Sequence, residues 1–219
     1  WKPDSFTVMR SRIAFVLVGI ALVCGCTSHR QLPGETEYQR MRESALASSE
    51  RCDTLVLGFH FGMGLFDCDM HTLKLAKAGT VTEQKVGGRF SVMVPTISEP
   101  LVAAYSCAWY ESKLADFTVV FTAADSSVTP RSMKEGLLLK YEEEFGPWYE
   151  VPGYTADTRK YVGICGNRQV EMVQGLTQAF MFFTDIRAIH ENPKAEDHVR
   201  KTHAKYAREQ SLLLPLTDD

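Results

Sequence analysis

The sequence lacks the short motifs that mark several common kinds of active site. It contains no GxSxG nucleophile elbow, no GxxxxGK[ST] phosphate loop, no GxGxxG fingerprint and no HExxH zinc motif. Each motif fixes a nucleophile, a phosphate or a metal at a defined turn or helix face, so the sequence does not point to these enzyme classes. We expect no catalytic residue, no metal and no cofactor.

An excess of positive charge is also missing. The chain has 24 Lys and Arg residues against 27 Asp and Glu residues, which gives a formal net charge of −3. The first 25 residues contain three basic residues and one acidic residue, so the remainder carries a net charge of about −5. This balance argues against nucleic acid, or an anionic membrane surface, as a main partner.

One apolar run stands out near the amino end, the eleven residues 13–23. A helix needs about twenty residues to cross the hydrocarbon core of a membrane, so this run is too short. It follows Arg10 and Arg12, and a basic segment followed by a short apolar segment predicts a cleaved export signal. Residues 1–8 precede the first methionine, Met9, and we expect them to lie upstream of that signal.

The four residues Val23-Cys24-Gly25-Cys26 resemble the lipobox of bacterial lipoproteins. The resemblance implies that residues 1–25 are removed and that the Cys26 sulfur receives diacylglycerol. One acyl chain holds a protein only reversibly, whereas the three chains of a lipoprotein attach it lastingly. We therefore expect a lipid-anchored protein of the bacterial cell envelope, at the outer membrane facing the periplasm. An ordinary signal peptide and an uncleaved anchor are the alternatives.

The remaining cysteines lack the paired spacing of a CxxC motif. They are Cys52, Cys68, Cys107 and Cys165. Thiols often serve as small core hydrophobes, and the apolar patterns around these cysteines favour free, buried thiols. An exported compartment permits disulfides, so one or two bridges are the alternative, and four cysteines allow three pairings.

Residues 26–35 predict a short polar tether, and residues 36–219 predict a single domain. Apolar residues at helical spacing predict helices at 36–51, 66–79, 130–145 and 193–208. Alternating or continuous apolar residues predict strands at 53–61, 81–85, 90–94, 102–110, 116–123, 161–165, 170–173 and 178–186. Hairpin connections outnumber helical crossovers, so the fold class is α+β, a mainly antiparallel sheet with helices packed on one face.

Phe66, Met70 and Leu73 recur at the spacing of a helix. Two other elements predict where the core lies. The residues Met133, Leu137, Tyr141 and Phe145 step by four along one face of a helix, and we expect this face to pack against the sheet. The segment Phe180–Phe183 is apolar on both faces, which indicates a strand in the centre of the sheet.

Two segments carry a wider resemblance. The chain resembles uncharacterised Bacteroidetes-type envelope lipoproteins in these two segments. The first is a strand that ends Leu57-Gly-Phe-His-Phe-Gly-Met63, and the second is a helix that ends Lys140-Tyr-Glu-Glu-Glu-Phe-Gly146. More distantly, the order of elements is similar to small α/β lipoproteins of outer-membrane assembly and to β-lactamase inhibitor protein. The resemblance implies an α+β fold and a location in the cell envelope, and it assigns no catalytic residue.

Two polar clusters are candidates for chemistry. The first contains His60, Asp67, Cys68, Asp69 and His71, and the second contains His190, His198 and His203. Neither has the ligand spacing of a zinc site, so we expect solvated carboxylates and polar surface at these positions.

The segment 146–154 is rich in aromatic residues and contains two prolines. Its three rings, Trp148, Tyr149 and Tyr154, are the candidate partner-binding residues, because Trp and Tyr are favoured interface anchors. We expect a non-catalytic module that binds a protein partner or an envelope glycan. The alternatives are an envelope hydrolase with a dispersed active site around His60 or His71, and an inhibitor-like module that presents this aromatic loop.

Overall fold

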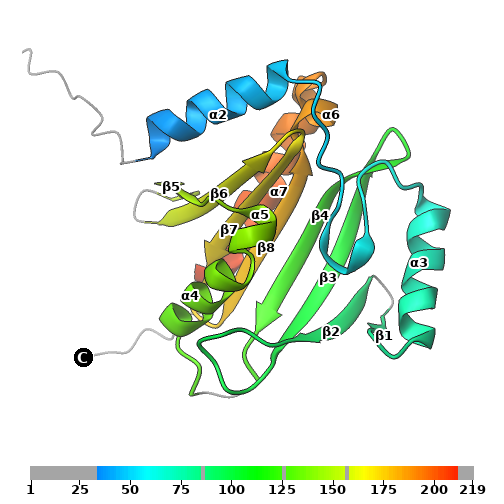
Figure 1. Ribbon diagram of the computed structural model, residues 1–219, viewed down its shortest axis with the longest axis vertical. Coiled ribbons are helices and arrows are strands. Elements are labelled where there is room, and N and C mark those ends of the chain that lie inside the picture. Colours follow the sequence, from blue (N-terminus) through cyan, green and yellow to red (C-terminus); the bar gives the residue numbers. More distant parts are fainter. Residues whose placement is uncertain (1–33, 85–86, 125–126, 156–157, 212–219) are drawn as a thin grey trace, which may run out of the picture. The chain divides into compact units, whose positions relative to one another are not determined.

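The computed structural model describes residues 34–84, 87–124, 127–155 and 158–211. These residues form one α+β domain around an open antiparallel sheet of eight strands, which confirms the predicted fold class (Figure 1). Cys26 and the residues 1–25 that we predict to be an export signal lie outside the described residues.

The sheet consists of two antiparallel meanders of four strands each. The first contains β1 (Thr82–Glu83), β2 (Gly88–Val92), β3 (Leu101–Tyr110) and β4 (Lys113–Thr122). The second contains β5 (Tyr149–Pro152), β6 (Arg159–Cys165), β7 (Arg168–Gln174) and β8 (Gln178–Asp185). The strand order is β1-β2-β3-β4-β8-β7-β6-β5, so β4 pairs with β8 and joins the meanders. The predicted central position of Phe180–Phe183 is therefore confirmed, whereas β5 falls in a segment predicted as a loop.

The helices are α2 (Glu35–Ala47), the 3₁₀ turn η1 (Val56–Gly58), α3 (Leu65–Lys77), α4 (Pro130–Lys140), α5 (Glu142–Phe145), α6 (Ile186–His190) and α7 (Pro193–Ser211). Thr129 caps α4 with its side chain, and Pro130 follows in the first turn, where the missing N–H costs nothing. Within the described part of the chain, none of these helices is long and apolar enough to cross a membrane.

One face of the sheet, here called the core face, carries the main hydrophobic core. Phe117, Met181 and Phe183 project from it into this core, where the Phe183 ring lies 5.0 Å from the Phe145 ring of α5. The helical residues Met133, Leu137, Tyr141 and Phe145 are all buried in this core, as their spacing predicts. Gly163 of β6 lets α5 approach the sheet, because a Cβ there would lie 1.9 Å from the Phe145 carbonyl oxygen.

The opposite face of the sheet, here called the cleft face, is covered by α2 and α7 (Figure 1). Ala45 of α2 packs on β5 and β6, and Ala207 of α7 packs beside Phe180 and Phe182. The prediction that helices pack on one face of the sheet is therefore wrong. The physical reason lies in β8, whose apolar residues point to both faces and need cover on both.

The strand predicted for residues 53–61 is also wrong. Leu57 and Gly58 have left-handed backbone angles, with φ of 59° and 78°, and η1 folds the segment back so that Thr54 bridges His60. Leu55, Phe59 and Phe61 are nevertheless buried. Val56 is buried as well and Leu57 is only partly buried, so burial in this segment does not follow the alternation of a strand.

Helix α3 exposes the apolar residues that recur along it at helical spacing. Phe66 is 73% exposed, and Met70 and Leu73 are exposed as well, while Cys68 and Thr72 are buried. The Thr72 hydroxyl lies 2.9 Å from the Tyr105 hydroxyl of β3, which fixes this orientation with a buried polar contact.

Candidate functional site

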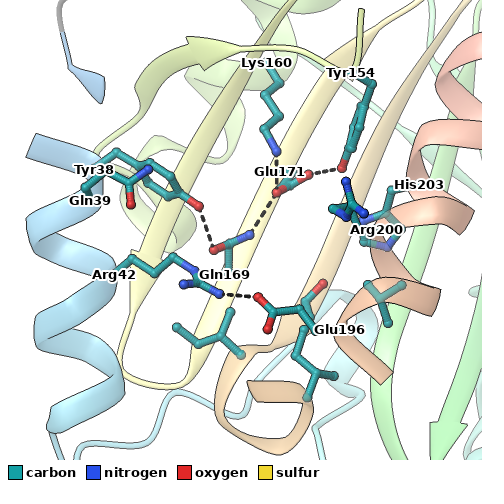
Figure 2. Close-up of a pocket in the computed structure, with 14 residues that line it drawn as sticks. Tyr38, Gln39, Arg42, Tyr154, Lys160, Gln169, Glu171, Glu196, Arg200 and His203 are labelled. Carbon is teal, nitrogen blue, oxygen red and sulfur yellow. Dashed lines mark hydrogen bonds and ion pairs between the residues drawn. The ribbon is translucent and has the colours of Figure 1, made fainter. Parts of the chain in front are cut away.

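The candidate site is a cleft on the cleft face of the sheet, between α2 and α7 (Figure 2). Its cavity has a volume of about 240 Å³. Strands β6, β7 and β8 form its floor, and the two helices form its walls. Polar and charged side chains dominate the lining: Tyr38, Gln39, Arg42, Tyr154, Lys160, Gln169, Glu171, Thr184, Glu196, Arg200 and His203.

Glu171 is the centre of the floor. Its buried carboxylate accepts hydrogen bonds from Lys160 Nζ at 2.7 Å, from Gln169 Nε2 at 2.8 Å and from the Tyr154 hydroxyl (Figure 2). Burial on its own would raise the pKa of Glu171, but the positive charge of Lys160 and the hydrogen bonds to the carboxylate outweigh it. The pKa of Glu171 therefore lies below its usual value, and the carboxylate stays ionised at neutral pH.

The tyrosines around Glu171 respond in the opposite direction. Burial and the neighbouring Glu171 charge raise the pKa of Tyr154, and they raise the pKa of Tyr38 to about 12. Both rings therefore remain protonated and donate hydrogen bonds, Tyr154 to Glu171 and Tyr38 to Gln169. The floor is a connected network in which each polar group has a partner.

A second buried pair lies beside this network. His203 of α7 and Asp116 of β4 are joined by a contact of 2.9 Å between Nε2 and Oδ1, and both side chains are less than 10% exposed. Thr184 donates to the same carboxylate oxygen at 3.2 Å. The imidazole stacks on the Phe182 ring with centroids 4.0 Å apart, so packing and hydrogen bonding together fix its position.

The two walls are joined across the cleft by an ion pair. Arg42 of α2 donates to Glu196 of α7 at 2.7 Å, from a position in the cavity lining (Figure 2). Because both side chains are partly exposed, we take this pair as a link between the helices with little effect on stability.

A second hollow of about 660 Å³ adjoins the first and shares Tyr154, Lys160 and Arg200 with it. Five residues of its lining are basic, namely Lys160, Arg200, Lys201, Lys205 and Arg208, and none is acidic. Gly153, Tyr154 and Ala204 complete the lining. We call it the basic hollow. Asp197, one turn earlier in α7, pairs with Arg200 and Lys201, and Glu171 pairs with Lys160, so the five basic residues of the lining outnumber these two acidic partners.

The structure separates the three candidate partner-binding rings. Trp148 is half-buried against the main core and donates from Nε1 to the Leu138 carbonyl oxygen at 3.2 Å. Tyr149 is half-buried beside Ala45 under α2. Tyr154 packs beside Phe180 and Phe182 and points into the cleft (Figure 2). The three rings belong to three clusters, and Tyr154 alone contributes to the candidate site.

The two histidines of the first polar cluster contact nearby backbone carbonyl oxygens. His60 Nδ1 contacts the Phe61 carbonyl oxygen, and His71 Nε2 contacts the Leu57 carbonyl oxygen at 2.9 Å. Neither lines the cleft. His203, predicted as polar surface, is instead 2% exposed and lies at the cleft floor, so that prediction is wrong.

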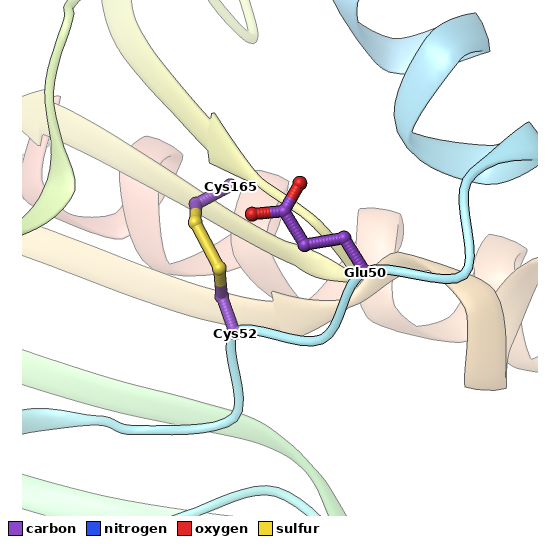
Figure 3. A group of neighbouring side chains, drawn as sticks. All are labelled: Glu50, Cys52 and Cys165. Carbon is purple, nitrogen blue, oxygen red and sulfur yellow. A yellow bond between two sulfur atoms is a disulfide. The ribbon is translucent and has the colours of Figure 1, made fainter.

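Two cysteines that the sequence predicted as free thiols are bonded to each other. Cys52, in the loop after α2, forms a disulfide with Cys165 at the end of β6, and Glu50 lies beside them (Figure 3). Because each sulfur is bonded to the other, this trio does not supply a metal with thiolate ligands. In the part of the chain that the structure describes, no other group of three His, Cys, Asp or Glu side chains has its ligand atoms close enough to hold a metal ion.

Comparison of the chain with protein-family models, with curated proteins and with solved structures returns no match. The resemblance to envelope lipoproteins therefore rests on the sequence motifs themselves, and the geometry of the cleft is the main guide to function.

Proposed function

We propose that this protein is a non-catalytic binding module of the bacterial envelope, and that it holds an anionic ligand in the basic hollow. The observation that carries the proposal is the lining of that hollow, which contains five basic residues and no acidic residue, although Glu171 and Asp197 reach three of the basic groups from outside the lining. Such a concentration of positive charge in a chain with a net charge of −3 favours a ligand of negative charge.

Lys160 is the fixed point of the hollow. Its ammonium group is held by Glu171 at 2.7 Å and lies over the Tyr154 ring, 4.7 Å from the centroid. A lysine that is already ordered loses less conformational entropy when a ligand binds than a freely moving one. The four α7 residues Arg200, Lys201, Lys205 and Arg208 supply further donors on one side of a helix.

Two features favour binding over hydrolysis. The buried acids and bases of the cleft are engaged with other protein groups, since Glu171 has three donors and Asp116 pairs with His203 and Thr184. In addition, the residues that line the cleft and the basic hollow include no serine and no cysteine that could act as a nucleophile.

The envelope address rests on the sequence. The short apolar run after Arg10 and Arg12 and the lipobox-like residues 23–26 support export followed by lipid attachment at Cys26. In that setting the anionic ligand is an acidic envelope glycan or the acidic segment of a protein partner, and the protein faces the periplasm from the outer membrane.

Titration calorimetry with inorganic pyrophosphate as the probe, at low salt, tests the binding site. Arg208→Gln removes one charge from the hollow, and we expect binding weaker by about ten- to a hundredfold, because a charge-assisted hydrogen bond contributes about 1.5–3 kcal/mol. Lys194→Gln is the matched control, since Lys194 lies on the same helix and outside the lining. Equal effects of the two substitutions, or no binding by the wild type, would refute an anion site here.

A further inference from the structure

The two free cysteines lie opposite each other across the contact between α3 and β3. Cys68 precedes Thr72 by one helical turn, and Cys107 follows Tyr105 by two strand residues, so each cysteine shares a face with its neighbour. The Thr72 and Tyr105 hydroxyls are 2.9 Å apart, which sets the register between helix and strand. The start of α3 also lies beside the end of β3, because Leu114 donates to the Met63 carbonyl oxygen at 2.8 Å and pairs with Trp109 of β3. Cys68 and Cys107 therefore lie near each other, and each thiol affects the pKa of the other.

Few buried side chains attach α3 to the rest of the domain. Cys68 and Thr72 are its buried residues, with Leu75 and Ala76 partly buried against the core. The outer side of the helix carries exposed apolar residues, Leu65, Phe66, Met70 and Leu73. A covalent bond at Cys68 would therefore strengthen the attachment of a helix that packing holds only along a narrow strip.

We propose that Cys68 and Cys107 form a second disulfide, which fastens α3 to β3. The bond forms by exchange with a disulfide donor, such as oxidised glutathione. The thiolate of one cysteine attacks a donor sulfur and releases one reduced thiol, and the second cysteine then attacks the mixed disulfide and releases the other. The two protein thiols lose two electrons and two protons in total, and the donor disulfide is reduced to two thiols.

The surroundings of the pair indicate when the bond forms. Burial raises the pKa of both thiols, and in Cys107 the neighbouring Cys68 adds to the effect. The thiolate is the attacking species, and Cys68 is only 2% exposed, so a donor disulfide reaches the folded pair slowly and we expect the bond to form while the chain is still folding. The disulfide between Cys52 and Cys165 is consistent with a chain that folds in an oxidising compartment.

Peptide mapping of the full chain tests the proposal directly. The chain is refolded in a buffer of oxidised and reduced glutathione, remaining thiols are alkylated in denaturant, and the protein is digested without reduction. No Lys or Arg lies between Cys52 and Cys68, so trypsin alone leaves both on one peptide, and chymotrypsin is added to cut at Phe59 and Phe61.

We expect a linked peptide pair containing Cys68 and Cys107 in addition to the pair containing Cys52 and Cys165. Alkylation of both Cys68 and Cys107 in a sample whose Cys52–Cys165 link is intact would overturn the proposal, because that link shows that oxidation and folding had occurred.

A thermal measurement adds a readout that does not depend on peptide recovery. The melting temperature of the wild type is compared in oxidised and reduced samples, and so is that of the Cys68→Ala/Cys107→Ala variant. The difference between the two samples should be larger in the wild type by about 8–16 °C, because a 39-residue loop is closed. An equal difference would overturn the proposal. Neither readout involves the basic hollow, so failure here leaves the proposed anion site untouched.

Discussion

The Lys160 ammonium and the Glu171 carboxylate form an ion pair at 2.7 Å beneath the cleft, with side chains that are 16% and 7% exposed. The pair joins β6 to β7, and its position requires both charges to be removed from bulk water. A buried pair of this kind contributes little beyond what an apolar pair would contribute, but the loss of one partner leaves the other charge uncompensated.

We predict that Lys160→Met lowers the free energy of unfolding by about 3–5 kcal/mol at pH 7. The double variant Lys160→Met/Glu171→Met should recover much of that loss, because no buried charge is left. Urea denaturation measures both. Arg131→Met provides the control, since Arg131 pairs with Glu135 in solvent, and it should leave stability unchanged. A double variant no more stable than Lys160→Met would contradict this account.

The pH dependence of the same variants has a definite sign. In the wild type the pKa of Glu171 is depressed, so its contribution to stability is present above about pH 4.5 and is lost as the pH falls through the lower folded value. Without Lys160 the effect of burial dominates and raises the pKa of Glu171. The variant should then lose stability as the pH rises from 4.5 to 7. Urea midpoints across this range give the slope, and an unchanged slope would show that Lys160 does not control Glu171.

A buried and an exposed phenylalanine should respond differently to replacement by alanine. Phe182 is fully buried and stacks on His203, so Phe182→Ala should destabilise the domain by about 3–5 kcal/mol. Phe66 is 73% exposed on α3, and Phe66→Ala should leave the melting temperature nearly unchanged. An equal loss of stability in the two variants would mean that α3 packs against the core through the side that carries Phe66.

Apolar periodicity located the central strand and the four long helices, but it did not show which face of the sheet each helix covers. The continuous run in β8 placed this strand in the centre of the sheet, because only a strand covered on both faces needs such a sequence. A strand that is apolar on both faces also requires helices on both faces of the sheet. The prediction of helices on one face did not take this into account. In α3 the apolar residues lie on the exposed side, and the buried side is fixed by the Thr72–Tyr105 contact, which no periodicity reveals.

The candidate site was mostly hidden from the sequence because its members come from separate elements. Tyr154 was predicted to bind a partner, and it lies in the cleft. Glu171 and Lys160, in contrast, are eleven residues apart and meet only because β6 and β7 are paired in a particular register. A glutamate at alternating position within an apolar strand is the one local signal that could have indicated a buried charge. The pairing of Cys52 with Cys165 likewise depends on the fold, since four cysteines allow three pairings.

Loss of the Cys52–Cys165 disulfide should destabilise the domain strongly. The two cysteines are 113 residues apart, and closing a loop of this length contributes about 4–5 kcal/mol in the chain-entropy model. We expect Cys52→Ala/Cys165→Ala to lower the urea midpoint accordingly, in samples with Cys68 and Cys107 held reduced. If the free energy of unfolding fell by less than about 1 kcal/mol, the loop would already be constrained in the unfolded chain.

Lipid attachment is the prediction on which the envelope address depends, and Cys24 and Cys26 make its test specific. The lipobox resemblance assigns the acceptor sulfur to Cys26, after the small residue Gly25, while Cys24 stands two residues earlier in the segment that is removed. In cells grown with labelled palmitate, the wild type and Cys24→Ser should both carry label and stay in the membrane fraction. Cys26→Ser should lose both the label and the membrane association, because the lipid chains supply the lasting attachment. If Cys26→Ser kept its label, the acceptor would lie elsewhere. If it lost the label but stayed in the membrane fraction, the uncleaved apolar run 13–23 would be the anchor.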